Sequence, residues 1–241
     1  MTALRSWLVL LAAVLAVAVT ARLGMWQLDR AAQKTTLQQA HDHLGKLPPL
    51  DGAALARDAS AVAVQASRKA AVDGVWQPEE TVYLDNRVMA GRTGFYVVSP
   101  LRLDDGHAVL VQRGWLPRNQ ADRTQIAPYR TPVGRVRVEG HIAPTLSRLY
   151  ELGHAASGPI RQNLDLAEHA LQTRLALLPL VIVQDDDASQ AGDGLLRQWP
   201  QPASDVSKNY GYAFQWFSLS LLAATLYVWF QIIRPRRRAH C

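Results

Sequence analysis

Cysteine is nearly absent from this sequence, which has only Cys241, at its last position. A single cysteine cannot form an intramolecular disulfide, so the fold must be held together by its core alone. The same scarcity excludes CxxC redox chemistry and the usual thiolate sites for copper or zinc. Copper delivery is therefore not favoured as a function.

Basic residues are not in excess over most of the chain, although the net charge is +6. Every aspartate and glutamate lies between Asp29 and Asp205. Five positive charges lie close to the two ends, on Arg5, Arg234, Arg236, Arg237 and Arg238. Over the rest of the chain basic residues exceed acidic residues by one. This balance predicts no nucleic-acid-binding surface.

The sequence motifs of common catalytic sites are also missing. There is no G-x-S-x-G, no P-loop, no G-x-G-x-x-G fingerprint and no His-Glu-x-x-His. Four central histidines stand singly and are interpreted as turn or surface residues: His107, His141, His154 and His169. The sequence therefore predicts no enzyme and no metal site.

The longest uncharged run covers residues 213–233, where Gln215 and Gln231 are the only residues with side-chain amides. As a helix, this run reaches roughly 30 Å, the thickness of the hydrocarbon layer of a bilayer. Aromatic residues lie near both of its ends, and the arginines that follow favour the cytoplasmic side. We predict a transmembrane helix at 211–234 and a basic cytoplasmic tail at 235–241. The alternative is a buried helix of a soluble protein.

A second apolar run covers residues 7–21, between Arg5 and Arg22. We interpret residues 1–25 as an N-terminal transmembrane helix, with Arg22 extending its charge to the far membrane surface. A cleaved secretory signal is the alternative, since residues 16–18 form a small-x-small site. Both interpretations place residues 26–210 on the periplasmic side of a bacterial inner membrane.

Between residues 69 and 142, short β-forming runs alternate with turn residues. Their close spacing favours antiparallel pairing, and Asp105-Gly106 predicts a hairpin turn. Farther on, Asp165 is expected to cap a helix that runs to about Leu178, with leucines as its buried face. The predicted strands cover residues 70–76, 81–86, 95–103, 108–116 and 133–142.

The predicted fold class is therefore α+β. Two transmembrane helices are expected to flank a periplasmic antiparallel β-rich domain. That domain is expected to be a small sheet or partial barrel with one or two helices.

Four residue clusters follow one another in a recognisable order. They are Gly24, Trp26, Gln27, Arg30 and Lys34; then Gly94 with Pro100 and Leu101; then residues 111–117, reading V-Q-R-G-W-L-P; then residues 212–217, reading Y-A-F-Q-W-F. Together they resemble the Surfeit-locus protein one family, which are assembly factors of cytochrome c oxidase. The resemblance covers both apolar ends and the middle of the chain.

The resemblance implies a non-catalytic membrane protein that helps to insert haem a into subunit I of the oxidase. Its implied partners are the lipid bilayer, subunit I and haem a synthase. Some members of the family bind haem a through a histidine three residues before the tyrosine that is Tyr212 here. Asn209 stands at that position, and an amide does not replace an imidazole as an axial iron ligand. Haem a binding stays open, with His141 or His154 as alternative ligands.

Two groups of candidate site residues follow. The candidates for contact with haem or a partner are Arg113, Trp115, Asn209 and Tyr212, and those for an interface are Trp26, Gln27, Arg30, Lys34, Gln215 and Trp216. Arg113 suits bidentate binding of a propionate or a partner's carboxylate. In the structural alternative, Arg113 satisfies a buried carboxylate, Trp115 fills the core and Gly114 occupies a turn.

Other functions remain as alternatives to oxidase assembly. One is a membrane-anchored periplasmic receptor or interaction domain, although the residues after 234 leave no room for a cytoplasmic output module. Another is a membrane-bound enzyme acting on haem or lipid.

Overall fold

The computed structural model describes residues 2–150, 158–186, 192–199 and 206–234. The chain forms two compact units, one from residues 1–40 and 201–241 and the other from residues 41–200. The predicted basic tail at 235–241 and His154 lie outside the described residues.

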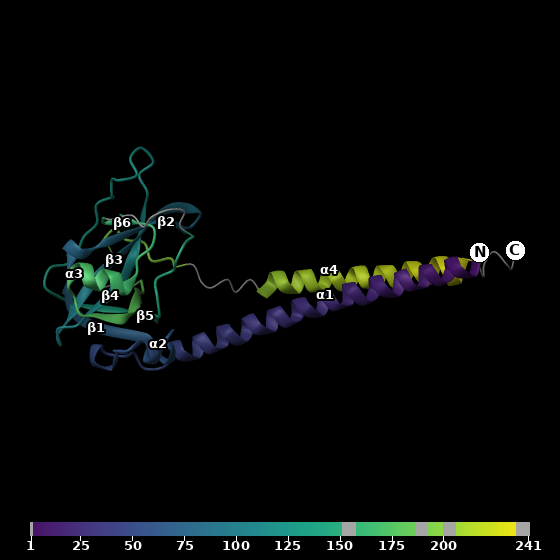
Figure 1. Cartoon of the computed structure of the whole chain (residues 1–241), viewed down its shortest axis with the longest axis horizontal. Helices are drawn as coiled ribbons and strands as arrows, with labels where there is room; N and C mark the ends of the chain where they lie inside the picture. Colours follow the sequence, from purple (N-terminus) through teal and green to yellow (C-terminus); the bar gives the residue numbers. More distant parts are fainter. Residues whose placement is uncertain (1, 151–157, 187–191, 200–205, 235–241) are drawn as a thin grey trace. The chain divides into compact units, whose positions relative to one another are not determined.

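The first unit is a pair of long helices that lie side by side (Figure 1). Helix α1 spans Thr2–Gly45. Helix α4 spans Val206–Val228 and continues as a π-helical turn at Trp229–Ile233. The start of α1 and the end of α4 lie at the same end of the pair, so the two helices are antiparallel (Figure 1).

Small residues let the two helices approach closely. Ser220 Oγ donates a hydrogen bond of 3.3 Å to the carbonyl oxygen of Val17. A Cβ atom added to Gly24 would lie 2.8 Å from the ring of Phe217, so a larger residue there would push that ring away. Glycine at helix crossings of this kind allows close backbone contact.

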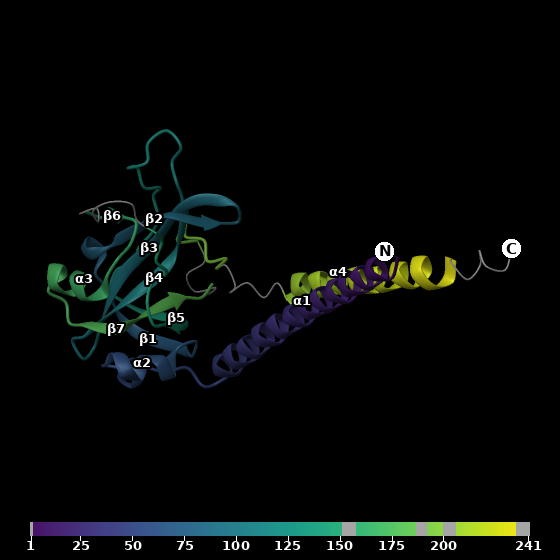
Figure 2. The ribbon, with the colours of Figure 1, turned by 45° about the vertical axis from the view of Figure 1, so that its right-hand side comes forward.

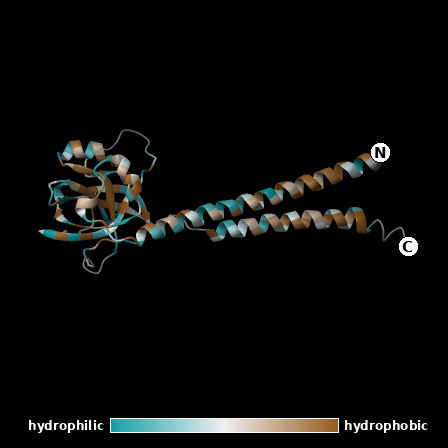
Figure 3. Cartoon of the chain, turned by 90° about the horizontal axis from the view of Figure 1, so that it is seen from below, coloured by the Kyte–Doolittle hydropathy of each residue, from teal (hydrophilic) through white to brown (hydrophobic). Residues whose placement is uncertain are grey.

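This pairing brings the apolar runs 7–21 and 213–233 alongside each other (Figure 3). Both helices are long and apolar enough to cross a membrane. Large apolar side chains on their outer surfaces are exposed, as expected for contact with lipid: Leu4, Trp7, Leu8, Leu11, Val14, Leu15, Phe214, Leu221 and Leu222. The pair is therefore compatible with membrane anchoring. Helix α1 stays helical beyond residue 25, where its composition becomes polar.

The second unit is a β-barrel with short helices around it (Figure 2). Five strands close the barrel in the order β1, β5, β7, β4 and β3, because β3 also pairs with β1. The predicted α+β class, with two apolar helices flanking a β-rich domain, is confirmed. The strands are β1 Lys69–Trp76, β2 Val82–Met89, β3 Arg92–Leu103, β4 Ala108–Pro117, β5 Arg135–Ala143, β6 Ile160–Arg161 and β7 Leu177–Gln184.

Short helical segments surround the strands. Helix α2 contributes Val62 to the barrel core, where it joins Leu180 and Ile182 of β7. The core is thus closed on this side by a helix, which protects its apolar residues from water. The segments are η1 Gly52–Ala54, α2 Ala59–Gln65, η2 Pro78–Glu80 and α3 Leu166–Thr173.

The predicted hairpin at Asp105-Gly106 is confirmed, since it joins the antiparallel strands β3 and β4 with Gly106 at φ +85°. The predicted antiparallel pairing of the strands between residues 69 and 142 is confirmed, since β1 to β5 pair with one another only in antiparallel fashion. Two pairs that involve later strands are parallel, β4 with β7 and β2 with β6. Parallel neighbours require a long crossover connection. The chain between β4 and β7, which includes β5 and α3, supplies it.

The helix predicted to run from Asp165 to about Leu178 is shorter than expected. Its cap is confirmed, because Asp165 Oδ1 accepts hydrogen bonds from the backbone N–H groups of residues 167 and 168. The helix ends at Thr173, since Arg174 is left-handed with φ +58°. Leu178 belongs to β7, and Leu171 is 82% exposed, so the predicted leucine face is wrong. Sheet pairing prevails here over local helical periodicity.

The buried residue of α3 is instead His169, which is 2% exposed. Burial, together with the charge of Arg161, lowers the pKa of His169 below its ordinary value of 6.5. The interpretation of His169 as a turn or surface residue was therefore wrong. Its neutral imidazole is part of the folded core.

This burial predicts an acid-sensitive barrel. The unfolded chain binds a proton on His169 more readily than the folded chain, so stability falls as the pH drops below about 6.5. We expect the thermal unfolding midpoint of the full chain in detergent to fall between about pH 7.5 and about pH 5. The decrease should be smaller in His169→Leu, whereas His43→Leu, at an exposed position of α1, should behave like the wild type. An identical pH dependence in all three proteins would contradict the assignment.

Candidate functional site

Three residues that the sequence singled out meet between α1 and α4 and form a polar cluster, defined here as Gln27, Lys34 and Asn209. Lys34 Nζ donates a hydrogen bond of 2.8 Å to Asn209 Oδ1. Asn209 Nδ2 donates one of 2.7 Å to Gln27 Oε1. The Asn209 amide therefore uses its acceptor and its donor to join the two helices.

The surroundings of the polar cluster bring the helices close together. Ala31 on α1 is fully buried and Ala213 on α4 is 2% exposed. Their small side chains permit the short distance that the hydrogen bonds need. The cluster lies where the charged part of α1 begins, about two to four helical turns beyond the apolar run.

The other candidate residues on these helices lie outside the polar cluster. The guanidinium of Arg30 lies 5.6 Å from the centre of the Trp26 ring, a cation–π contact along the surface of α1. Trp216 is half-buried, while Tyr212 and Gln215 are exposed. An amphipathic ring such as Trp26 suits the level of the lipid headgroups.

The polar cluster does not fit axial ligation of haem iron at position 209. An amide is a poor iron ligand, and both polar atoms of Asn209 already bind protein groups. Of the alternative ligands, His141 lies on β5 with Nδ1 3.2 Å from Asp185 Oδ1. Its ring is thus engaged with a carboxylate of its own unit.

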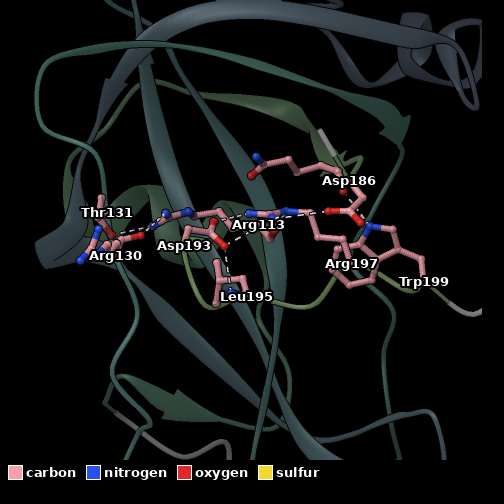
Figure 4. Close-up of polar contacts among 9 residues, drawn as sticks. Arg113, Arg130, Thr131, Asp186, Asp193, Leu195, Arg197 and Trp199 are labelled. Atoms are coloured by element: carbon pink, nitrogen blue, oxygen red, sulfur yellow. Dashed lines mark hydrogen bonds and ion pairs between the residues drawn. The ribbon is translucent and has the colours of Figure 1, made fainter. Parts of the chain in front are cut away.

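The second group of candidate residues comprises Arg113 and Trp115 on β4, and Figure 4 shows Arg113 with its neighbours. Arg113 is fully buried. Its Nη1 donates a hydrogen bond of 2.8 Å to Thr131 Oγ1, and its Nη2 donates one of 3.2 Å to the carbonyl oxygen of Arg130. The guanidinium also lies 4.4 Å from the centre of the Trp76 ring. Burial lowers the pKa of Arg113, and the nearby Tyr129 and Asp193 oppose that effect.

A buried ion pair lies beside Arg113. Arg197 Nη2 pairs with Asp193 Oδ2, and the side chains are 1% and 6% exposed. Arg197 Nε also donates a hydrogen bond of 2.7 Å to the carbonyl oxygen of Arg113 (Figure 4). The structural alternative expected Arg113 to satisfy a buried carboxylate. The buried carboxylate beside it, Asp193, forms its ion pair with Arg197, a residue that the sequence did not single out. The one feature of the sequence that could have indicated this pair is the spacing of four residues between Asp193 and Arg197.

Trp115 and Gly114 complete this part of β4. Trp115 is 1% exposed, and its Nε1 donates a hydrogen bond of 2.8 Å to the carbonyl oxygen of Arg87. Gly114 lies within the strand and not in a turn, and an added Cβ would lie 2.6 Å from Leu195 Cβ. Trp115 thus packs in the core, and contact of Arg113 or Trp115 with haem or a partner stays a prediction.

Comparison with known proteins covers both units. The model of the SURF1 family matches residues 14–221. The chain belongs to the SURF1 family.

Named relatives are distant but match over most of their length. A SURF1-like protein of Rickettsia bellii is 23% identical over 208 residues, which are 85% of this chain and 83% of the relative. One of Rickettsia felis is 26% identical over 211 residues, 86% of this chain and 89% of the relative. An uncharacterized SURF1-like protein of Mycobacterium tuberculosis is 26% identical over 228 residues, 90% and 80% of the two chains.

Membership in the SURF1 family confirms the resemblance on which the candidate residues were chosen. The matched range includes both candidate groups, from Gln27 and Lys34 on α1 to Asn209 and Trp216 on α4. The structure brings Gln27, Lys34 and Asn209 together and buries Arg113 and Trp115 in the barrel.

The polar cluster predicts that Asn209 stabilises the helix pair of this SURF1 family member. Asn209→Leu keeps the side-chain size but removes both hydrogen bonds, and it should weaken the pair by about 1–2 kcal/mol. The measurement is titration of the full chain in mild detergent with sodium dodecyl sulfate, followed by energy transfer between dyes at positions 4 and 232. Thr225→Ala is the matched control, because Thr225 bonds within α4, to the carbonyl oxygen of Leu221. A loss no larger than in this control would contradict the role.

The buried ion pair predicts a large effect in the barrel. Arg197→Met leaves the Asp193 carboxylate buried without its cationic partner and should destabilise the barrel by about 3–5 kcal/mol. Adding Asp193→Asn should recover part of the loss, because the remaining charge is removed. Urea unfolding followed by tryptophan fluorescence measures both. Arg135→Met, which breaks an exposed pair with Asp104, should cost no more than about 1 kcal/mol.

Proposed function

We propose that this SURF1 family member is a membrane-anchored assembly factor for haem-copper cytochrome c oxidase. It acts on subunit I through protein contacts and assists the insertion of haem a. The observation that carries the proposal is the family match over residues 14–221, which spans both apolar helices and the barrel between them. A match limited to the barrel would support the fold of the barrel, but it would not support the role of the two helices as membrane anchors.

The charges at the ends of the helices support an orientation in the membrane. Arg5 near the start of α1 and Arg234 at the end of α4 lie at the same end of an antiparallel pair (Figure 1). The positive-inside bias favours the cytoplasm for that end. We infer that both termini are cytoplasmic and that the barrel faces the periplasm, where it can reach the outer face of a newly inserted subunit I.

The proposed role is one without catalysis, as the resemblance to the SURF1 family implies. Within the described ranges, no group of three or more His, Cys, Asp or Glu residues is arranged to hold a metal ion. Gln27, Lys34 and Asn209 bond to one another, and Arg113 bonds to Thr131 and to the carbonyl oxygen of Arg130. The proposed role relies on contacts with other proteins, namely subunit I and haem a synthase.

Haem handling by this chain would differ from that of relatives with a histidine at position 209. Asn209 is committed to the helix pair, so we expect no axial ligation through it. Protein purified from cells that make haem a should therefore show no haem absorption band that arises from iron ligation by Asn209. The role would then consist of protein contacts.

The proposed function predicts a defect confined to the oxidase. Deletion of the gene should lower both the haem a absorbance of the membranes and the amount of subunit I, because unassembled subunit I is degraded. Expression of the wild-type chain should restore both. The cytochromes b and c in the same membranes are the control and should be unchanged. An unaltered oxidase spectrum in the deletion strain would exclude the role.

A further inference from the structure

A polar pocket of about 450 Å³ lies on the barrel, between the turn that joins β2 to β3 and the segment that follows β4. Three arginines line it, Arg92, Arg118 and Arg123, and we call it the arginine pocket. Asn119 and Gln120 add side-chain amides, and no carboxylate is among its lining residues. None of its lining residues belongs to the polar cluster, and none is a hydrogen-bond partner of the Arg113 guanidinium.

Arg118 is held in place before any ligand binds. Its Nη2 pairs with Asp85 Oδ1 and donates a hydrogen bond of 2.7 Å to Asn86 Oδ1. Its guanidinium lies 5.8 Å from the centre of the Phe95 ring. Its Nε is buried and has no hydrogen-bond partner among the described residues. The side chain is 16% exposed, so Arg118 forms a rigid wall of the pocket with one carboxylate already bound.

The other two arginines carry uncompensated charge. Arg92 lies over the Trp115 ring at 5.8 Å, and it forms no ion pair within the described parts of the chain. Arg123 is exposed and likewise has no ion-pair partner there. The nearest acid in sequence, Asp122, accepts hydrogen bonds from the backbone and hydroxyl of Thr124, which hold its carboxylate in its own turn.

The chemistry of the lining narrows the class of ligand. Guanidinium groups bind carboxylates and phosphates through paired hydrogen bonds. A lipid also needs an apolar surface for its chains, and Pro117 is the one apolar side chain of the lining. A single inorganic ion would fill only a small part of about 450 Å³. Two or more carboxylates on one polypeptide segment match both the charge and the size.

We propose that the arginine pocket binds an acidic segment of a partner protein, through carboxylates that pair with Arg92 and Arg123. The identity of the partner as an oxidase component rests on the proposed function, but the class of segment does not. The pocket thereby supplies a docking point on the barrel for a protein that carries clustered aspartate or glutamate side chains.

Photo-cross-linking of the full chain in its native membranes tests this proposal. A photoreactive residue, benzoylphenylalanine, replaces Gln120 in the pocket, and mass spectrometry identifies what becomes attached. We expect a peptide that contains at least two Asp or Glu residues close together. Arg92→Glu combined with Arg123→Glu should lower the yield about tenfold, which corresponds to about 1.4 kcal/mol. Higher salt should lower it too.

Matched variants separate charge at the pocket from charge in general. Arg102→Glu combined with Lys46→Glu makes the same change in net charge at two exposed positions outside the pocket, and it should leave the yield unchanged. Should the first pair of variants fail to fold, Arg92→Gln combined with Arg123→Gln tests the same contacts without charge reversal. Circular dichroism checks folding in each case.

The cross-linked product tests the pocket proposal and the proposed function separately. Adducts with lipid, adducts with a peptide lacking acidic residues, no adduct at all, or a yield insensitive to Arg92 and Arg123 would each overturn the proposal. An acidic peptide from a protein unrelated to the oxidase would uphold the pocket and count against the proposed function. If deletion of the gene impairs the oxidase but no acidic peptide is cross-linked, the proposed function is supported and the pocket proposal is overturned.

Discussion

The barrel depends on the pairing of one long strand, β3, along both of its edges. One edge pairs with β4 over nearly its whole length. The other edge is shared, since β2 pairs with residues 92–98 and β1 pairs with residues 101–103. Because β1 takes the far end of β3, the five-stranded part of the sheet closes, and backbone groups at the β1 and β3 edges that would otherwise face water are paired there. The β2–β3 turn, which forms one wall of the arginine pocket, extends from this strand.

Closure of the barrel also explains how charged side chains come to be buried. The backbone carbonyl of Arg113 accepts a hydrogen bond from Arg197, which pairs with Asp193 in the segment 193–197. The segment is tied to β4 by hydrogen bonds between the backbones of Trp115 and Leu196. Burying an ion pair adds little net stability, but breaking one is costly. The pair therefore fixes where this segment lies on the barrel more than it raises overall stability.

The helix pair follows a different physical rule. Its apolar surface suits hydrocarbon, so packing between the helices relies on small residues and on a few hydrogen bonds. Gly24 and Ala213 provide the close approach, and Asn209 provides the bonds. In this SURF1 family member Asn209 thus supports the helix pair itself.

The sequence by itself determined the features that depend on local composition. An uncharged run as long as 213–233 indicates a membrane helix because hydrocarbon requires apolar side chains throughout. Alternating residues indicated the strands, the Asp105-Gly106 turn indicated its hairpin, and the ordered motifs indicated the family. Each signal is read from the order of residues along the chain, so no knowledge of spatial contacts was needed.

Only the tertiary structure decided which distant residues meet. Asn209 bonds to Gln27 across 182 positions and Arg197 to Arg113 across 84, and neither pair has a local signature. The parallel pairing of β7 with β4 likewise ended α3 early, because backbone groups at Leu177 found partners in the sheet that a helix would have denied them. Such choices depend on which groups remain unpaired once the barrel closes, and that is a property of the whole fold.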